Sequence, residues 1–120
     1  MKEYVDGFVI PILKKNVAAY KKMAAGAGKV WMDHGAIQYI ECVGDDLKAM
    51  NGTPGFRKML KAKPNETVLF SWVVYESKAH RNKVNAAVMK DPRIAEMMKD
   101  KMLFDVKKML YGGFKPIVKN

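Results

Sequence analysis

The stretch TVLFSWVVY, residues 67–75, decides the fold of this chain. β-branched and aromatic residues dominate it, which is typical of a β-strand. Both faces of this strand are apolar, with Ser71 as its one small polar residue, and a strand that is apolar on both faces is covered on both faces. Because the helices of one small domain cover only one side of its sheet, we expect a second copy of the chain against the other side.

A first helix follows from apolar residues in steps of three and four. It is expected to begin after the cap residue Asn16 and to end at His34, where Gly35 forms a left-handed cap. Gly26 and Gly28 each weaken this helix by roughly 1 kcal/mol, but they allow close approach to a sheet.

Two further helices are predicted from their start signals. Ser77 caps a helix with an apolar stripe, and Asp91 followed by Pro92 starts a short one. Residues 47–65 lack a regular pattern and are expected to form a flap, a lid or a loop with one helical turn. The expected strands are Tyr4–Ile12, Ala36–Val43, Thr67–Tyr75 and Val106–Tyr111, with a free tail after Gly112–Gly113.

The order of these elements is strand, helix, strand, strand, helix, strand. This is the split βαβ pattern, so the sequence predicts an α+β fold, a ferredoxin-like βαββαβ sandwich. There is no internal repeat or linker, and residues 1–120 are expected to form a single domain.

Composition places the chain among globular proteins, with 49% hydrophobic and 28% charged residues. Its only cysteine, Cys42, has no partner for an internal disulfide, and the first residues lack the apolar run of a secretory signal. We therefore expect a cytoplasmic protein without a membrane segment.

The chain is strongly basic, with a formal net charge of +10. Such a surplus suits nucleic acids or anionic ligands. The lysines are scattered and form no long block, which favours a solubilising role, so nucleic-acid binding is not the expected function.

Both histidines are candidates for catalysis. His80 lies on the apolar stripe of the second helix, next to Arg81, a fixed cation that can hold a carboxylate or an enolate. His34 can act as a general base at the rim of a pocket between helix and sheet. The alternatives are a core or first-turn histidine for His80, and for His34 a helix-end histidine favoured by the helix dipole.

Asp6 and Glu41 are acidic residues within otherwise apolar strands, where a carboxylate is costly unless it is paired. With Arg81 they can form an acid–base or ligand-binding cluster, or else a salt bridge or a water-facing edge. The run from Glu41 to Asp46 lacks the spacing of a calcium loop, and no metal is expected.

Large aromatic side chains can wall a ligand pocket, although at this periodicity they are usually core. Trp31 and Trp72 are the candidates, with Tyr39 as a possible third. No phosphate-binding loop, dinucleotide fingerprint or nucleophile elbow occurs, so no cofactor is expected. Cys42 is interpreted as an inert thiol.

Short motifs along nearly the whole chain carry a resemblance to a known family. They are Tyr4-Val5-Asp6-Gly7-Phe8, Gly28-Lys29-Val30-Trp31, His34-Gly35-Ala36, Tyr39 to Asp46, Lys61-Ala62-Lys63-Pro64, Phe70-Ser71-Trp72, Ser77 to Arg81, Val84-Asn85, Asp91-Pro92-Arg93 and Tyr111-Gly112-Gly113-Phe114. On these motifs the chain resembles the YbaA-like family within the dimeric α/β-barrel superfamily. The resemblance implies a ferredoxin-like domain whose sheet pairs face to face with that of a second subunit, and it implies no activity.

Three functions stay open at this point. The first is a small-molecule-binding protein or cofactor-free enzyme, with a pocket between helices and sheet for an apolar or anionic ligand. The second is a non-catalytic dimeric module for stress or protein interaction. The third is RNA binding through Phe70 and Trp72, although the strand lacks the interleaved basic residues and glycines of an RNA-recognition motif.

Overall fold

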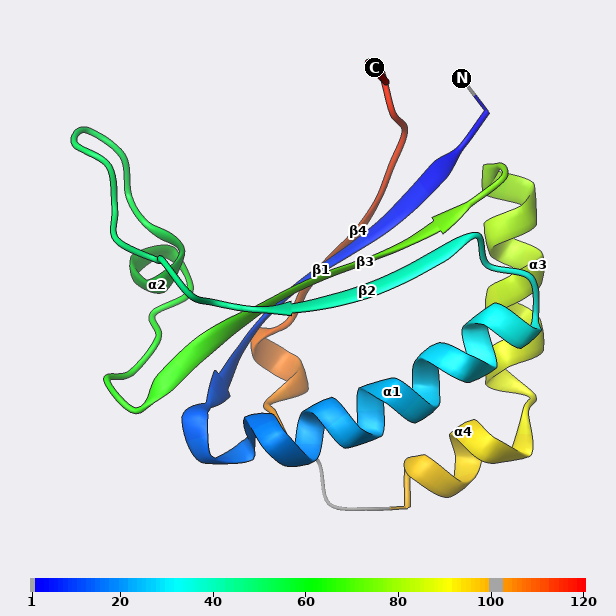
Figure 1. Cartoon of the computed structure of the whole chain (residues 1–120), viewed down its shortest axis with the longest axis horizontal. Coiled ribbons are helices and arrows are strands. Elements are labelled where there is room, and N and C mark those ends of the chain that lie inside the picture. Colours follow the sequence, from blue (N-terminus) through cyan, green and yellow to red (C-terminus); the bar gives the residue numbers. More distant parts are fainter. Residues whose placement is uncertain (1, 100–102) are drawn as a thin grey trace.

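The structure is a computed structural model that describes residues 2–99 and 103–120. It contains one sheet with the strand order β2-β3-β1-β4 and only antiparallel pairs. The helices α1, α3 and α4 lie on one side of this sheet (Figure 1). The strands are β1 (Tyr4–Leu13), β2 (Gln38–Val43), β3 (Glu66–Tyr75) and β4 (Leu110–Phe114), and the α-helices are α1 (Val17–Asp33), α2 (Phe56–Met59), α3 (Lys78–Met89) and α4 (Pro92–Met97). The predicted ferredoxin-like α+β fold is confirmed.

The helix starts agree with the sequence in two places and differ in one. The Ser77 hydroxyl accepts a hydrogen bond from the His80 N–H at 3.0 Å, and the Asp91 carboxylate accepts one from the Arg93 N–H at 2.9 Å, so both predicted caps are confirmed. Asn16 precedes α1 but does not cap it, because its side-chain amide donates to the Leu103 carbonyl at 3.1 Å.

Two predicted glycine roles in and after α1 are confirmed. Gly35 follows the helix with φ = 109°, a conformation that side chains disfavour. A Cβ at Gly28 would lie 2.9 Å from the Tyr39 ring, so this glycine does permit close contact with the sheet. Gly26 faces Met97 of α4 instead of a strand.

The last strand is displaced from its predicted position. Residues Val106–Lys108 form a 3₁₀ helix, and β4 begins only at Leu110. Gly112 and Gly113, expected to free a tail, pair with Gly7 and Asp6 of β1. Their small size explains the difference, since the Phe114 ring packs over Gly7 on one face while Gly113 leaves room for Tyr4 on the other.

The two faces of β3 have different surroundings within one chain. On the helix side, Leu69, Val73 and Tyr75 are buried. The other side, which we call the open face, carries Phe70 and, from β4 beyond β1, Leu110 and Phe114. These three side chains are 46%, 58% and 60% exposed. The chain itself therefore leaves these three apolar side chains about half exposed, although Val68 on the same face is buried.

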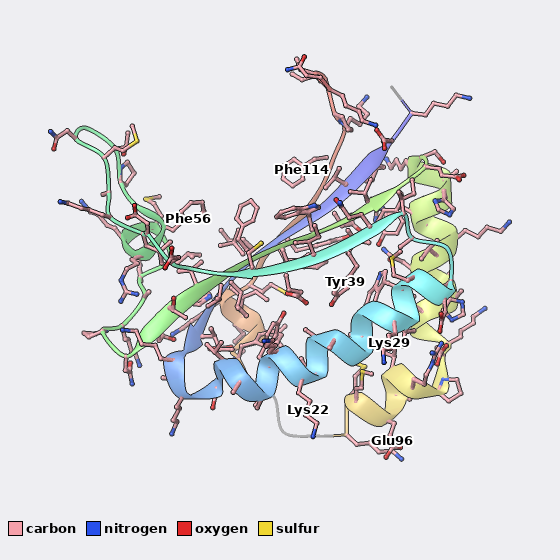
Figure 2. The ribbon with its side chains drawn as sticks, viewed as in Figure 1. Lys22, Lys29, Tyr39, Phe56, Glu96 and Phe114 are labelled. Atoms are coloured by element: carbon pink, nitrogen blue, oxygen red, sulfur yellow. The ribbon has the colours of Figure 1, made fainter. Side chains whose placement is uncertain are left out.

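Residues 47–65 form a flap that projects beyond one end of the sheet, with α2 at its base (Figure 1). The Arg57 guanidinium fastens this base by donating to the Glu66 and Lys63 carbonyls at 2.6 and 2.8 Å. Phe56 contacts the edge of Phe70 with ring centroids 6.1 Å apart, so the flap continues the apolar open face, as the position of Phe56 in Figure 2 shows.

Of the helices that the structure describes, none is both long enough and apolar enough to cross a membrane.

Candidate functional site

Glu41 is held by two tyrosine hydroxyls between α1 and the sheet. Tyr20 of α1 donates to Glu41 Oε1 and Tyr39 of β2 donates to Oε2, each at 2.7 Å. Tyr39 and Glu41 are two residues apart on one strand and therefore share its helix-facing side. Tyr20 reaches them from the buried stripe of α1.

Both tyrosines keep their protons at neutral pH. Burial raises the pKa of Tyr20 well above its ordinary value, and the charge of Glu41 together with the hydrogen bond raises it further. The same causes, in the same order, raise the pKa of Tyr39. The phenols therefore act as donors and Glu41 as the acceptor of both hydrogen bonds.

No positively charged group completes this cluster. Among residues 2–99 and 103–120, no lysine, arginine or histidine forms an ion pair with Glu41 within 4.0 Å. Glu41 is half-buried, and its two oxygens have more lone pairs than the two tyrosine hydroxyls use. Glu41 is thus an acceptor with unused capacity.

Two cavities flank Glu41. An inner cavity of about 170 Å³ lies between α1 and the helix-facing side of the sheet, and an outer groove of about 660 Å³ runs between α1 and the edge strand β2. Four residues line both spaces: Tyr20, Ala24, Tyr39 and Glu41. Tyr39 occupies the space between β2 and α1 in Figure 2.

The inner cavity is apolar apart from its tyrosine–glutamate end. Ser71, which pairs with Glu41 across the β2–β3 ladder, is the other polar residue along it. The rest of the lining is hydrophobic and includes Phe8, Ile10, Trp31, Phe104 and Met109. Small-molecule sites have this character, with an apolar wall and a few convergent polar groups.

A second carboxylate, Asp6 of β1, lies at another place on the same sheet face and is paired. Arg81 Nε of α3 is 3.6 Å from Asp6 Oδ1, and Asn85 and Tyr111 each donate to this carboxylate at 3.3 Å. The Arg81 guanidinium also donates to the Tyr4 hydroxyl at 3.3 Å. Asp6 is only 1% exposed, so this ion pair belongs to the interior.

The Asp6 cluster continues into a chain of hydrogen bonds across the core. Tyr75 donates to the Asn85 side-chain carbonyl at 2.9 Å, and the Trp31 indole N–H lies 3.2 Å from the Tyr75 hydroxyl. Burial and the nearby Asp6 charge raise the pKa of Tyr75, which keeps it a donor. The network connects β1, β3, α1 and α3, although the buried Arg81 Nε has no hydrogen-bond partner in it and makes only the 3.6 Å charge contact with Asp6.

Neither histidine lines the two cavities beside Glu41. His80 Nδ1 accepts the Glu76 backbone N–H at 3.0 Å, and its ring contacts Tyr75 edge-on. His34 Nε2 lies 2.8 Å from Asp91 Oδ2. The catalytic roles expected for His80 and His34 stay predictions.

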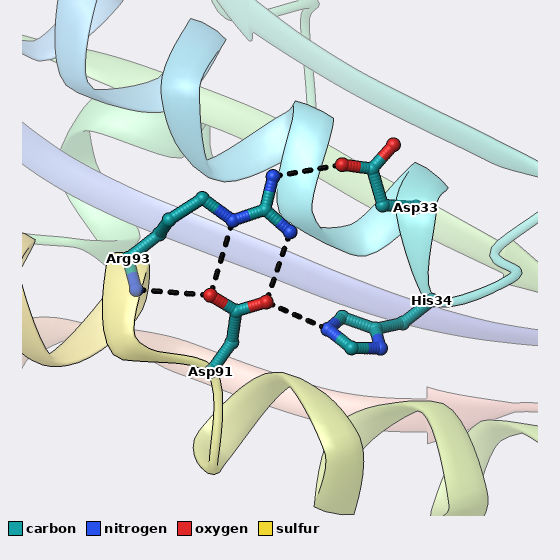
Figure 3. A network of polar contacts seen from close by, with 4 residues as sticks. All are labelled: Asp33, His34, Asp91 and Arg93. Atoms are coloured by element: carbon teal, nitrogen blue, oxygen red, sulfur yellow. Dashed lines mark hydrogen bonds and ion pairs between the residues drawn. The ribbon is translucent and has the colours of Figure 1, made fainter.

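His34 belongs to a polar network that joins the end of α1 to the start of α4 (Figure 3). Arg93 bridges Asp91 and Asp33, at 2.9 and 2.7 Å. Hydrogen bonds from Arg93 and then from His34 hold the pKa of Asp91 well below its usual range. This arrangement is that of a helix-to-helix tie, because each acid already has its cation.

The structure thus separates the predicted ligand-binding residues. Glu41 and Trp31 line the inner cavity, whereas Asp6 and Arg81 pair with each other elsewhere. The Trp72 side chain lies on the open face, where its indole N–H donates to the Gln38 side-chain carbonyl at 3.0 Å and its ring contacts Phe70. The partnership of Tyr20 with Glu41 was missed by the sequence analysis. The only signal was that Tyr20 lies on the buried stripe of a helix next to an acidic strand, which does not define a distance. No group of three or more His, Cys, Asp or Glu gathers as a metal site within the described part of the chain.

The fold and this site define a ferredoxin-like α+β protein with an apolar, carboxylate-bearing cavity under its sheet. The model of the family described as "Protein of unknown function (DUF1428)" matches residues 3–106, and the chain belongs to this family. A curated relative, "Uncharacterized protein YbaA" of Escherichia coli strain K12, is 41% identical over 116 residues, which cover 97% of each chain.

Two solved structures share the fold at low sequence identity. One is a mutant form of SnoaB, a cofactor-independent oxygenase from Streptomyces nogalater. It has a TM-score of 0.59 and 11% identity, with 99% of this chain and 97% of that one covered. The other is a nipsnap family protein with unknown function from Agrobacterium tumefaciens, with a TM-score of 0.61, 17% identity and coverage of 96% and 88%. At these identities the likeness shows the fold alone.

Proposed function

We propose that this protein binds a small molecule between α1 and the sheet, with Glu41 as the group that recognises or deprotonates it. One observation carries the proposal: Glu41 lines both cavities, and no lysine, arginine or histidine of the described residues forms an ion pair with it within 4.0 Å. A carboxylate in such a place is completed by a ligand.

Cofactor-free proton transfer is the chemistry that this geometry supports. Glu41 would take a proton from an O–H or C–H group of the ligand, and the electron pair would stay on the ligand as an oxyanion or enolate. The Tyr20 and Tyr39 hydroxyls would then be released from the neutral acid and could donate to that anion. SnoaB, whose fold this chain shares, is described as a cofactor-independent oxygenase, which supports small-molecule chemistry on this fold.

Native mass spectrometry of the untagged protein, purified from cells, tests the proposal. We expect a retained small-molecule mass that is lost in Glu41→Gln, a change that keeps the shape but removes the charge. Glu96→Gln is the matched control, since Glu96 is exposed and pairs only with Lys99 at 3.2 Å. Retention of the same mass by Glu41→Gln would contradict the role of Glu41. An apo mass, with no ligand found on screening, would favour the non-catalytic dimeric module.

We also propose that a second copy of the chain covers the open face. Its exposed apolar side chains are Phe70, Leu110 and Phe114, and the flap residue Phe56 adjoins them. A stable interface buries about 800 Å² on each partner. Because each copy carries a net charge of +10, association should strengthen as salt screens the repulsion.

Sedimentation analysis of the wild type and of Phe70→Glu tests the proposed dimer. The wild type should be a dimer and the variant a monomer, and a monomeric wild type would overturn the proposal.

A cytoplasmic location goes with this proposal. It is supported by Cys42, which has no second cysteine in the chain to pair with.

A further inference from the structure

We propose that the ligand is an apolar molecule that presents a hydrogen-bond donor, a hydroxyl or a protonated amine, to Glu41, and that the inner cavity rejects carboxylates. This inference rests on the proposed function, because it names the class of ligand for that same site. From the sequence we expected an apolar or an anionic ligand, and this inference keeps the first alternative and excludes the second for the inner cavity.

The first support is that no hydrogen-bond donor is left free at the polar end of the cavity. A phenol has one proton to donate, and both Tyr20 and Tyr39 donate theirs to Glu41. Glu41 itself is an acceptor while it is ionised. Toward a ligand, these three groups therefore offer only lone pairs, and the complementary ligand group is a donor.

The second support is the charge around the inner cavity. Glu41 is the one charged side chain along its described lining. Electrostatic interactions are stronger in such a low-dielectric, apolar space than in water. A ligand carboxylate near Glu41 would meet a like charge with no cation between them, whereas a hydroxyl or an ammonium would gain a charge-assisted hydrogen bond.

Arg81, the cation that could bind an anionic ligand, is already paired with other groups of the protein. Its guanidinium is occupied by Asp6, Tyr4 and Tyr111, and it lines neither cavity. Lys21 and Lys29 reach only the outer groove, where their exposed ammonium groups are screened by salt.

The third support is the size and lining of the cavity. A space of about 170 Å³ is close to that of engineered apolar cavities, about 150 Å³, that hold a benzene ring. Phe8, Trp31 and Phe104 give it aromatic walls. The larger outer groove shares Tyr20 and Tyr39 with it as lining residues.

Two probes with the same ring system and different charge test the inference. The affinities of 2-naphthol and 2-naphthoate for the full chain would be measured by calorimetry at pH 7, with about 0.5 M salt to screen Lys21 and Lys29. We expect 2-naphthol to bind at least about 10-fold more tightly than 2-naphthoate, since like-charge juxtaposition costs several kcal/mol. In Glu41→Gln the ratio should fall to within about 3-fold, because the repelling charge is gone. Glu96→Gln should keep the wild-type ratio.

The outcomes separate the two proposals. Equal binding of both probes to the wild type, or tighter binding of 2-naphthoate, overturns the ligand class while the cavity remains a binding site. An unchanged ratio in Glu41→Gln also overturns it, because the selectivity would then come from another group. If neither probe binds the wild type, the proposed small-molecule site fails together with the inference.

Discussion

Two carboxylates on the helix-facing side of one sheet have opposite surroundings. Asp6 of β1 is 1% exposed and has Arg81 at 3.6 Å, with Asn85 and Tyr111 as further donors. Glu41 of β2 has two tyrosine donors, no ion-pair partner within 4.0 Å among the described residues, and a cavity on each side. In the sequence, Asp6 and Glu41 are alike in that each is an acidic residue within an otherwise apolar strand.

This difference in surroundings separates an acid that stabilises the fold from an acid that is available to a ligand. A buried ion pair that carries its own cation is complete, and removing either partner leaves an uncompensated charge. A carboxylate next to open space, with acceptor capacity left over, gains when a ligand fills that space. We therefore expect changes at the Asp6 cluster to alter stability, and changes at Glu41 to alter binding.

Arg81→Met should have the largest effect. It strips Asp6 of its cation in the interior, and breaking a buried pair from one side costs about 3–5 kcal/mol. The free energy of unfolding, from urea titration at a fixed protein concentration, measures this. Lys99→Met is the matched control, because its exposed pair with Glu96 is worth about 0.5 kcal/mol or less. A loss below about 1 kcal/mol in Arg81→Met would remove the distinction between the clusters.

Gly28→Ala should have the next largest effect, and it acts on the Glu41 side. The added Cβ would lie 2.9 Å from the Tyr39 ring, which is packed and cannot withdraw easily. Overpacking of this kind costs about 1–3 kcal/mol, and the displaced Tyr39 should loosen its bond to Glu41. Thermal unfolding and probe binding would show both losses.

Gly26→Ala is the internal control for that experiment. It lies on the same helix, and its Cβ would meet only the flexible end of Met97. Alanine should therefore stabilise α1 by about 0.5–1 kcal/mol through helix propensity. If both alanines behave alike, Gly28 does not position Tyr39.

Glu41→Gln should change stability by less than about 1 kcal/mol, since the amide carbonyl still accepts one tyrosine and no cation is orphaned. Its effect should fall on ligand binding instead. Urea unfolding and calorimetry on the same sample compare the change in stability with the change in ligand affinity. A loss as large as that of Arg81→Met would mean that Glu41 is a structural acid.

The smallest effect concerns the ionisation of the tyrosines. Burial first, and the Glu41 charge second, raise the pKa of Tyr20 and Tyr39 above the ordinary value of about 10. A group whose folded pKa is raised contributes stability that is fully present below the unfolded pKa and is lost as the pH rises toward the folded pKa. Alkaline unfolding should therefore begin above about pH 10.

Tyrosinate absorbance against pH measures this directly. In the wild type, Tyr20 and Tyr39 should ionise only as the chain unfolds. In Glu41→Gln their pKa should fall part of the way toward the ordinary value and no further, because burial remains as the larger cause. Full ionisation of both tyrosines near pH 10 in the folded wild type would contradict their donor role.

Much of the fold was predictable because its signals are local. The strand at residues 67–75, the caps Ser77 and Asp91 and the left-handed Gly35 are all confirmed. Each depends on the preference of a few adjacent residues for one backbone conformation. The last strand was misplaced because Gly112 and Gly113 have poor strand propensity. They are held in the sheet by contacts with Phe114 and Tyr4, which are not visible in their own neighbourhood.

The sequence by itself determined the class of fold, the helix boundaries and the presence of two acids in apolar strands, since these depend on periodicity and short-range conformational preference. Only the tertiary structure decided which acid is paired. Arg81 is 75 positions from Asp6 and 40 from Glu41 in the chain, and both separations are compatible with contact. The strand order puts α3 against Asp6 and places Tyr20 and Tyr39 with a cavity at Glu41. The environment of a charge depends on distances between elements, and those exist only once the chain has folded.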